Sequence, residues 1–149
     1  MIFKQLFHSE SSTFTYLLGD EVTREALLID PVLEKTQETL ELINQLGLTL
    51  VLAIETHTHA DHITGLGALR ERTGCKTMMG RQSLADCLSA NFTDGDEIDM
   101  GDINLKVIYS PGHTDDSYSF YAHKHGMLFS GNTLLIRGTG GTDFQNWDA

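Results

Sequence analysis

A polar run that directly follows an apolar segment constrains this chain more than any other feature. The apolar segment covers residues 48–54, in which Thr49 is the one polar residue, and such a run is expected of a buried strand. Three imidazoles and one carboxylate follow within six residues: His57, His59, Asp61 and His62. Imidazole and carboxylate are the usual protein ligands of zinc and of non-haem iron. The sequence therefore predicts a metal site at the end of a buried strand, in preference to a solvated polar turn.

Two turns in the second half of the chain carry further candidate ligands. His113 lies in Ser-Pro-Gly-His-Thr, residues 110–114, after a predicted strand. Pro and Gly fix a tight turn, so the imidazole is presented from a defined backbone. Asn132 follows Gly131 after another predicted strand. Because strand-end turns can meet along one edge of packed sheets, we expect His113 and residue 132 to converge on the histidine cluster.

The remaining pattern is one of short strands and helices without a linker or an internal repeat. Strands are predicted at residues 2–7, 14–18, 26–30, 48–54, 76–79, 98–100, 103–109, 118–121 and 127–129, and helices at 33–46, 63–72 and 83–89. Gly47 is expected as the left-handed residue that ends the first helix, and Gly74 lies beyond the second. The pattern predicts a single domain over residues 1–149, with an α+β fold.

The charge and composition of the chain limit the classes of partner that it is expected to bind. The chain has 10 Lys+Arg against 21 Asp+Glu, a net charge of −11, which argues against nucleic acid and against anionic membrane surfaces. No apolar run approaches the length of a membrane span, and no signal peptide is evident, so a cytoplasmic location is expected. Cys75 and Cys87 match no zinc or redox spacing and are predicted to be free thiols. His8, His123 and His125 lack the context of a site and are predicted to lie at the surface.

The motifs resemble those of the metallo-β-lactamase superfamily. The resemblance is carried by Thr-His-x-His-Ala-Asp-His at 56–62, Pro-Gly-His-Thr at 111–114 and the later Gly-Asn loop, where that family has Gly-Asp. Leu-Leu-Ile-Arg-Gly at 134–138 and Thr-Asp-Phe-Gln at 142–145 are similar to the persulfide dioxygenase branch, which also resembles glyoxalase II. The resemblance covers essentially the whole chain. It implies an αββα sandwich of two mixed sheets flanked by helices, incomplete at the C-terminus relative to the family.

The resemblance also implies a cofactor and a reaction. In that branch a mononuclear Fe(II) is held by residues that correspond to His57, His113 and position 132, with Zn²⁺ as the alternative metal. His59 completes the first site in other superfamily members, and Asp61 and His62 form a second. The branch uses O₂ to oxidise glutathione persulfide to sulfite and glutathione. Asp61 or His62 would then orient ligands or move a proton.

Arg137 has two interpretations. Placed just after an apolar strand end, it would either hold a carboxylate of glutathione or pair with Asp143 as part of the scaffold. Arginine suits both roles, because its planar guanidinium binds a carboxylate through two hydrogen bonds.

Three departures from the family pattern keep other functions open. Asn132 replaces an aspartate, and a neutral amide is a weaker ligand, so reduced metal affinity is expected. Gly141 stands where the branch has an arginine, and the sequence ends at Ala149, before the family's last segments. Such a chain is a fragment, a domain completed by a partner chain or by a second copy, or an inactive relative. A glyoxalase-II-like thioester hydrolase, with a metal-activated water, and a non-catalytic metal-binding protein are the alternatives to the dioxygenase.

Overall fold

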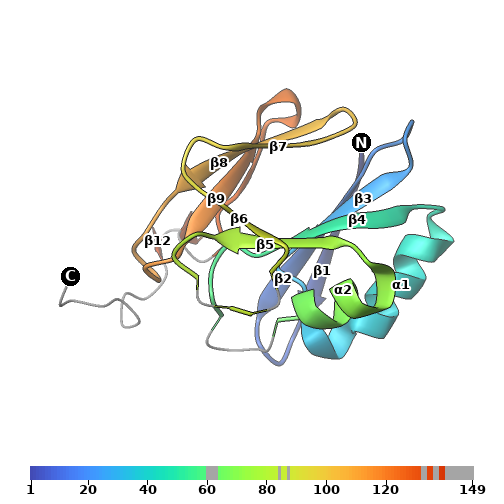
Figure 1. Cartoon of the computed structure of the whole chain (residues 1–149), viewed down its shortest axis with the longest axis horizontal. Helices are drawn as coiled ribbons and strands as arrows, with labels where there is room; N and C mark the ends of the chain where they lie inside the picture. The colour runs from blue at the N-terminus through green and yellow to red at the C-terminus, as the bar shows by residue number, and fades with distance from the viewer. Residues whose placement is uncertain (60–63, 84, 87, 132–133, 136–137, 140–149) are drawn as a thin grey trace.

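The computed structural model describes residues 1–59, 64–83, 85–86, 88–131, 134–135 and 138–139 (Figure 1). Its elements in chain order are β1 (Ile2–His8), β2 (Thr13–Gly19), β3 (Glu25–Ile29), η1 (Leu33–Lys35), α1 (Thr36–Gln45), β4 (Thr49–Ile54), α2 (Leu66–Thr73), β5 (Lys76–Gly80), β6 (Ala90–Phe92), β7 (Glu97–Met100), β8 (Ile103–Tyr109), β9 (Tyr118–Ala122), η2 (His123–His125), β10 (Met127–Phe129), β11 (Leu134–Leu135) and β12 (Gly138–Thr139). None of the helices within these residues is long and apolar enough to cross a membrane.

Most of the strands form two sheets. The first has the order β1-β2-β3-β4-β5-β6 and is mixed, as predicted, because β1 to β3 pair antiparallel whereas β3 to β6 pair parallel. The second has the order β10-β9-β8-β7. Its described strands are all antiparallel, so the expectation of two mixed sheets is wrong for this one. Consecutive strands in it are joined by short connections, which favour antiparallel pairing.

The main core lies between the two sheets. On β3, Leu27 and Ile29 face the second sheet, whereas Ala26 and Leu28 face the helices, as the alternation of a strand requires. The second sheet contributes Ile103, Leu105, Val107, Tyr118 and Phe120 to this core, all at most 1% exposed. Both faces of the first sheet are therefore covered, which explains the unbroken apolar runs in β3 and β4.

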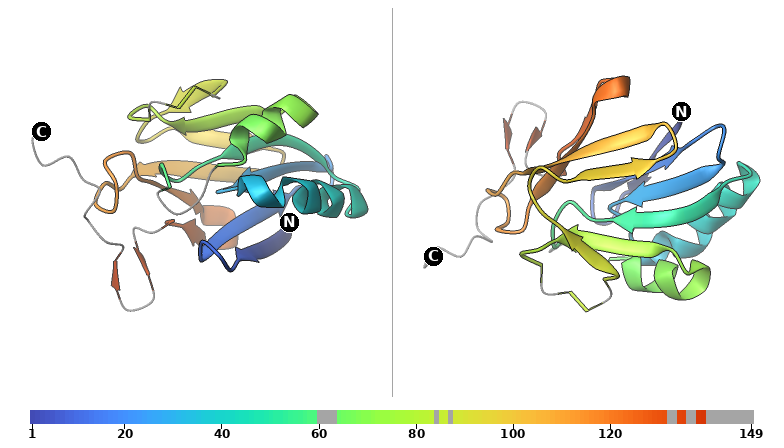
Figure 2. Two further views of the ribbon diagram at one scale, coloured as in Figure 1. Left: turned by 90° about the horizontal axis from the view of Figure 1, so that it is seen from below. Right: turned by 45° about the horizontal axis from the view of Figure 1, so that its top comes forward.

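Both α-helices cover one face of the first sheet. Ile43 of α1 and Leu66 and Leu69 of α2 pack in the core on that side, and Figure 1 shows both helices on the side away from β7, β8 and β9. Two further views show the same layer order (Figure 2). Among the described residues no helix covers the outer face of the second sheet, where Tyr121 and Leu128 are exposed. The fold is thus the expected sandwich with one helical layer described.

Several local predictions are confirmed. Gly47 and Gly74 adopt positive φ values after α1 and α2, as helix-ending glycines do. The strands predicted at 98–100 and 103–109 correspond to β7 and β8, which pair antiparallel.

Two local predictions are wrong. None of the described residues between 83 and 89 is helical. The Ser89 hydroxyl and amide instead bond to Thr77 on β5, which ties this segment to the sheet, and such local bonds compete with a helix. His8 is also not a surface residue: it is only 5% exposed at the end of β1. Its Nδ1 forms a hydrogen bond with the Ser11 hydroxyl, so this ring nitrogen has a partner without water.

Candidate functional site

Two acidic residues mark the edge of the first sheet at which the site lies. Strands β3 and β4 run parallel with Ile29 opposite Ile54, so the next residues, Asp30 and Glu55, emerge at the same edge. Both side chains are buried, with Asp30 3% and Glu55 0% exposed. Asp30 adopts a φ of +56°, a conformation that aspartate tolerates better than most residues. Its backbone amide donates to the Ile54 carbonyl at 2.9 Å.

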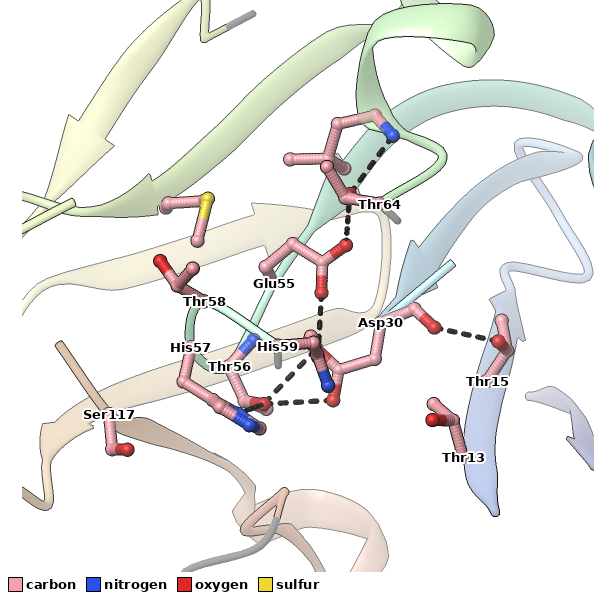
Figure 3. A network of polar contacts seen from close by, with 12 residues as sticks. Thr13, Thr15, Asp30, Glu55, Thr56, His57, Thr58, His59, Thr64 and Ser117 are labelled. Carbon is pink, nitrogen blue, oxygen red and sulfur yellow. Dashed lines mark hydrogen bonds and ion pairs between the residues drawn. The ribbon is translucent and has the colours of Figure 1, made fainter. Parts of the chain in front are cut away.

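A hydrogen-bond relay runs from Asp30 through Thr56 to His57 (Figure 3). The Thr56 hydroxyl donates to Asp30 Oδ2 at 2.8 Å, and the Thr56 amide donates to Asp30 Oδ1 at 2.7 Å. Because that hydroxyl proton is directed to the carboxylate, the oxygen accepts from His57 Nδ1, which lies 2.8 Å away. The network therefore assigns the proton to Nδ1 and leaves a lone pair on Nε2.

His57 Nε2 is the atom best suited to bind a metal. It is buried and has no hydrogen-bond partner among the residues that the structure describes. Burial, and then the positive charge of His59, lower the pKa of His57 to about 4, so the ring is neutral near pH 7. A neutral buried imidazole with one nitrogen held and the other unpaired is the form that ligates a metal.

His59 lies against His57 but directs one nitrogen to the acids. The two ring centroids are 4.0 Å apart, and His59 Nε2 lies 3.0 Å from Glu55 Oε2 and 3.3 Å from Asp30 Oδ1. Burial alone would lower the pKa of His59, but the Asp30 carboxylate outweighs it and raises that pKa to about 11. Burial, together with the charge of Asp30, raises the pKa of Glu55 to about 8. The metal-free cluster thus holds an imidazolium between one carboxylate and one neutral carboxyl group at pH 7.

His113 reaches the site from the second sheet. Its ring centroid lies 4.9 Å from that of His57, with the planes nearly perpendicular at 82°. The turn that carries it is fastened by the buried Asp116, which accepts from the Thr58 amide at 3.0 Å and from the Thr114 hydroxyl at 2.6 Å. Tyr118 also donates its amide to the Thr56 carbonyl at 2.7 Å. These bonds fix the spacing between the two histidine-bearing loops.

A third loop closes on the same point. Gly131 follows β10 with a φ of +55°. A Cβ atom at this position would clash with the Thr56 hydroxyl and lie 3.3 Å from His57 Nδ1. Only glycine allows the backbone to approach the relay so closely.

The structure brings three of the sequence-predicted residues together: His57, His59 and His113. The predictions for Asp61, His62, Asn132 and Arg137 concern positions outside the described residues. Asp30 and Glu55 were not predicted as site residues. A signal for both was available, because each is an acid that directly ends an apolar strand.

The sequence was compared with a family model and with known proteins, and these comparisons agree with one another. The sequence model for the family described as "Metallo-beta-lactamase superfamily" matches residues 9–86 and 88–149. The bovine protein "Persulfide dioxygenase ETHE1, mitochondrial" is 48% identical over 146 residues, which cover 97% of this chain and 57% of that protein. A hydroxyacylglutathione hydrolase from Francisella philomiragia is 37% identical over 137 residues, covering 91% of this chain and 52% of the relative. The chain thus spans little more than half the length of these relatives.

A solved structure extends the similarity to the fold. The crystal structure of ETHE1 from Myxococcus xanthus matches with a TM-score of 0.93 and 51% sequence identity, over 98% of this chain and 64% of that one. A metallo-beta-lactamase structure from Staphylococcus aureus matches with a TM-score of 0.84 and 30% identity, over 96% of this chain and 46% of that one. The arrangement of sheets and helices described above is therefore shared with these two solved structures.

Proposed function

Because the chain belongs to the metallo-β-lactamase superfamily, we propose that it acts as an iron-dependent persulfide dioxygenase. One observation carries this proposal. Identity to proteins named as persulfide dioxygenases or ETHE1 reaches 48–51% over nearly the whole chain, against 37% to the hydroxyacylglutathione hydrolase. The proposed reaction converts glutathione persulfide, O₂ and water into glutathione and sulfurous acid, which ionises to sulfite. The cytoplasmic location remains a prediction from the sequence.

The metal proposed for the site is a mononuclear Fe(II), held by His57, His113 and Asn132, with Zn²⁺ as the alternative. The unpaired, buried Nε2 of His57 fits such a group, and His113 lies beside it. Iron would supply the redox chemistry that joins O₂ to the persulfide sulfur. The open positions that three protein ligands leave are suited to holding both reactants.

The protein's own side chains are proposed to hold the metal ligands in place, to move a proton and to contact the substrate. The relay from Asp30 through Thr56 keeps the proton on Nδ1 of His57 and holds the ring in one orientation. Asp116 ties the turn of His113 to the segment of Thr58, so the two imidazoles keep their spacing. Asp61 or His62 is proposed to orient ligands or to move a proton, and Arg137 to contact glutathione.

Asn132 makes the proposal testable within the site. An amide oxygen carries no charge, so a dication held by His57, His113 and Asn132 has no anionic ligand in this set. The Asn132→Asp variant is therefore expected to bind Fe(II) and Zn²⁺ more tightly than the native chain. Calorimetric titration of the metal-free proteins measures this difference, and equal affinity would remove Asn132 from the ligand set.

The decisive experiment measures iron content and oxygen uptake on protein purified without air. About one iron per chain, together with uptake of O₂ on addition of glutathione persulfide, is the expected result. Iron without uptake, in both the native chain and Asn132→Asp, would refute the dioxygenase assignment for this chain.

A thioester hydrolase is the second candidate, favoured by the similarity to the hydroxyacylglutathione hydrolase. Both activities would use a metal at the same histidines but differ in products. Cleavage of a glutathione thioester without oxygen uptake would assign the chain to the hydrolase. Metal binding without either activity would leave the non-catalytic metal-binding protein.

A further inference from the structure

A second group of side chains of the types that ligate metals lies outside the central site. It consists of His8 at the end of β1, Glu10 in the turn toward β2, and Glu34 in η1. One ligand atom from each lies within 4.8 Å of the other two. His8 Nε2 lies 3.4 Å from Glu34 Oε2 and 3.8 Å from Glu10 Oε2. Both glutamates are exposed, whereas the His8 side chain is 6% exposed.

The hydrogen bonds around His8 determine which of its ring nitrogens carries the proton when the ring is neutral. The Ser11 hydroxyl donates to Thr13 Oγ1 at 3.0 Å, so it accepts from His8 Nδ1, which lies 2.5 Å away. In the neutral ring the proton is therefore on Nδ1, and Nε2 carries a lone pair. Nε2 is buried and has no hydrogen-bond partner within the described part of the chain. Metal-ligating histidines are generally held in this way through the other nitrogen.

The distances suit a shared cation better than direct hydrogen bonds. A hydrogen bond from nitrogen to oxygen spans about 2.7–3.2 Å, and both separations here are longer. Two ligands bonded at about 2.1 Å to one tetrahedral ion lie roughly 3.4 Å apart. A lone pair that faces two carboxylates also repels them, so a positive particle between these groups is favoured.

We propose that His8, Glu10 and Glu34 bind a divalent transition-metal ion such as Zn²⁺. Three protein ligands, one imidazole and two carboxylates, leave at least one position for water. The ion links the turn after β1 to η1, two segments that are distant in sequence. The site therefore acts as a structural clamp on the first sheet, and it does not depend on the activity proposed for the central site.

The test follows the His8 ring directly, because the central histidines are also proposed to bind a metal. The full chain is labelled with ¹⁵N, and the imidazole resonances are recorded during titration with Zn²⁺. The Nε2 signal of His8 is expected to shift and to saturate, separately from the signals of His57 and His113. Glu34→Gln is expected to weaken this transition by at least about tenfold. As Glu34 is exposed, its substitution leaves the core intact.

The matched control is Glu38→Gln, the same change at an exposed glutamate one turn further along, which pairs with Lys35. It is expected to leave the His8 transition unchanged. Equal weakening by Glu34→Gln and Glu38→Gln would indicate a non-specific acidic surface and overturn the proposal. A His8 signal that responds to acid but not to millimolar Zn²⁺ would overturn it as well, because a proton would then occupy the position of the metal.

Discussion

Replacing Thr56 with valine tests whether the relay from Asp30 prepares His57 for a metal. Valine keeps the branched shape of threonine and replaces only the hydroxyl with a methyl group. The hydroxyl's contacts are then lost: the donation to Asp30, at 2.8 Å to Oδ2 and 3.1 Å to Oδ1, and the acceptance from His57 Nδ1 at 2.8 Å. The donation from the Thr56 amide to Asp30 at 2.7 Å remains, so the carboxylate keeps one partner from this residue.

The size of the effect follows from the groups that are left unpaired. A hydrogen bond to a charged group contributes about 1.5–3 kcal/mol, and a buried unpaired donor costs about 1–3 kcal/mol. A loss of roughly 3 kcal/mol in the free energy of unfolding lowers the Tm of a chain of this size by about 6–12 °C. Metal affinity is expected to fall by about 10- to 100-fold, the usual effect of removing a group that holds a ligating histidine.

Thermal denaturation of the metal-free protein and titration with Zn²⁺ against a competing chelator measure the two effects. The matched control is Thr56→Ser, which keeps the hydroxyl and loses the methyl group. Serine is expected to retain most of the metal affinity. The reasoning is refuted if Thr56→Val binds zinc as tightly as the native chain, or if Thr56→Ser loses as much affinity as valine does.

Three other predictions concern the site and the core. Gly131→Ala places a methyl group against the Thr56 hydroxyl, at a residue with left-handed backbone conformation. Metal affinity should therefore fall in the same chelator titration, and unchanged affinity would show that the loop can move aside. Because the pKa of Glu55 is raised from its ordinary 4.5 to about 8, the folded state holds an extra proton on this group between these values. Stability should therefore fall as pH rises from 6.5 to 8, with Glu55 contributing at most about 1.4 kcal/mol per pH unit. Denaturant unfolding of the metal-free protein across this range should show a shallower fall for Glu55→Gln, and an identical slope would contradict the assignment. Phe120→Ala in the core between the sheets should cost about 3–5 kcal/mol, whereas Tyr121→Ala, on the exposed side of the same strand, should cost much less in the same denaturant assay.

Most of the fold could be predicted because its strands are either unbroken apolar runs or clear alternations. Apart from the exposed Thr49, the segment at 48–54 is apolar, since β4 is covered on both faces. In β8, by contrast, Ile103, Leu105 and Val107 face the core and their neighbours do not. The segment at 83–89 was predicted wrongly because hydrogen bonds to β5, invisible in the local pattern, override its helical spacing.

Only part of the candidate site could be predicted from the sequence. His57, His59 and His113 could be predicted to meet, because imidazoles at strand ends indicate metal chemistry whatever their partners. The roles of Asp30 and Glu55 depend on which strands are neighbours, and the parallel pairing of β3 with β4 is a long-range property. His8 was assigned to the surface for the same reason, since its burial depends on packing beyond β1.

Asp30 couples the stability of the fold to the geometry of the site. A buried carboxylate is costly unless it is paired and hydrogen-bonded, and here its partners are the amide and hydroxyl of Thr56 and the ring of His59. Those same partners hold or contact His57. Removing Asp30 would therefore take one of two carboxyl partners from the buried ring of His59, leaving Glu55, and would release the relay at once. Its substitution thus cannot separate a loss of folding from a loss of metal binding. Thr56 can separate them, because valine leaves the carboxylate bonded to the amide and the ion pair with His59 in place.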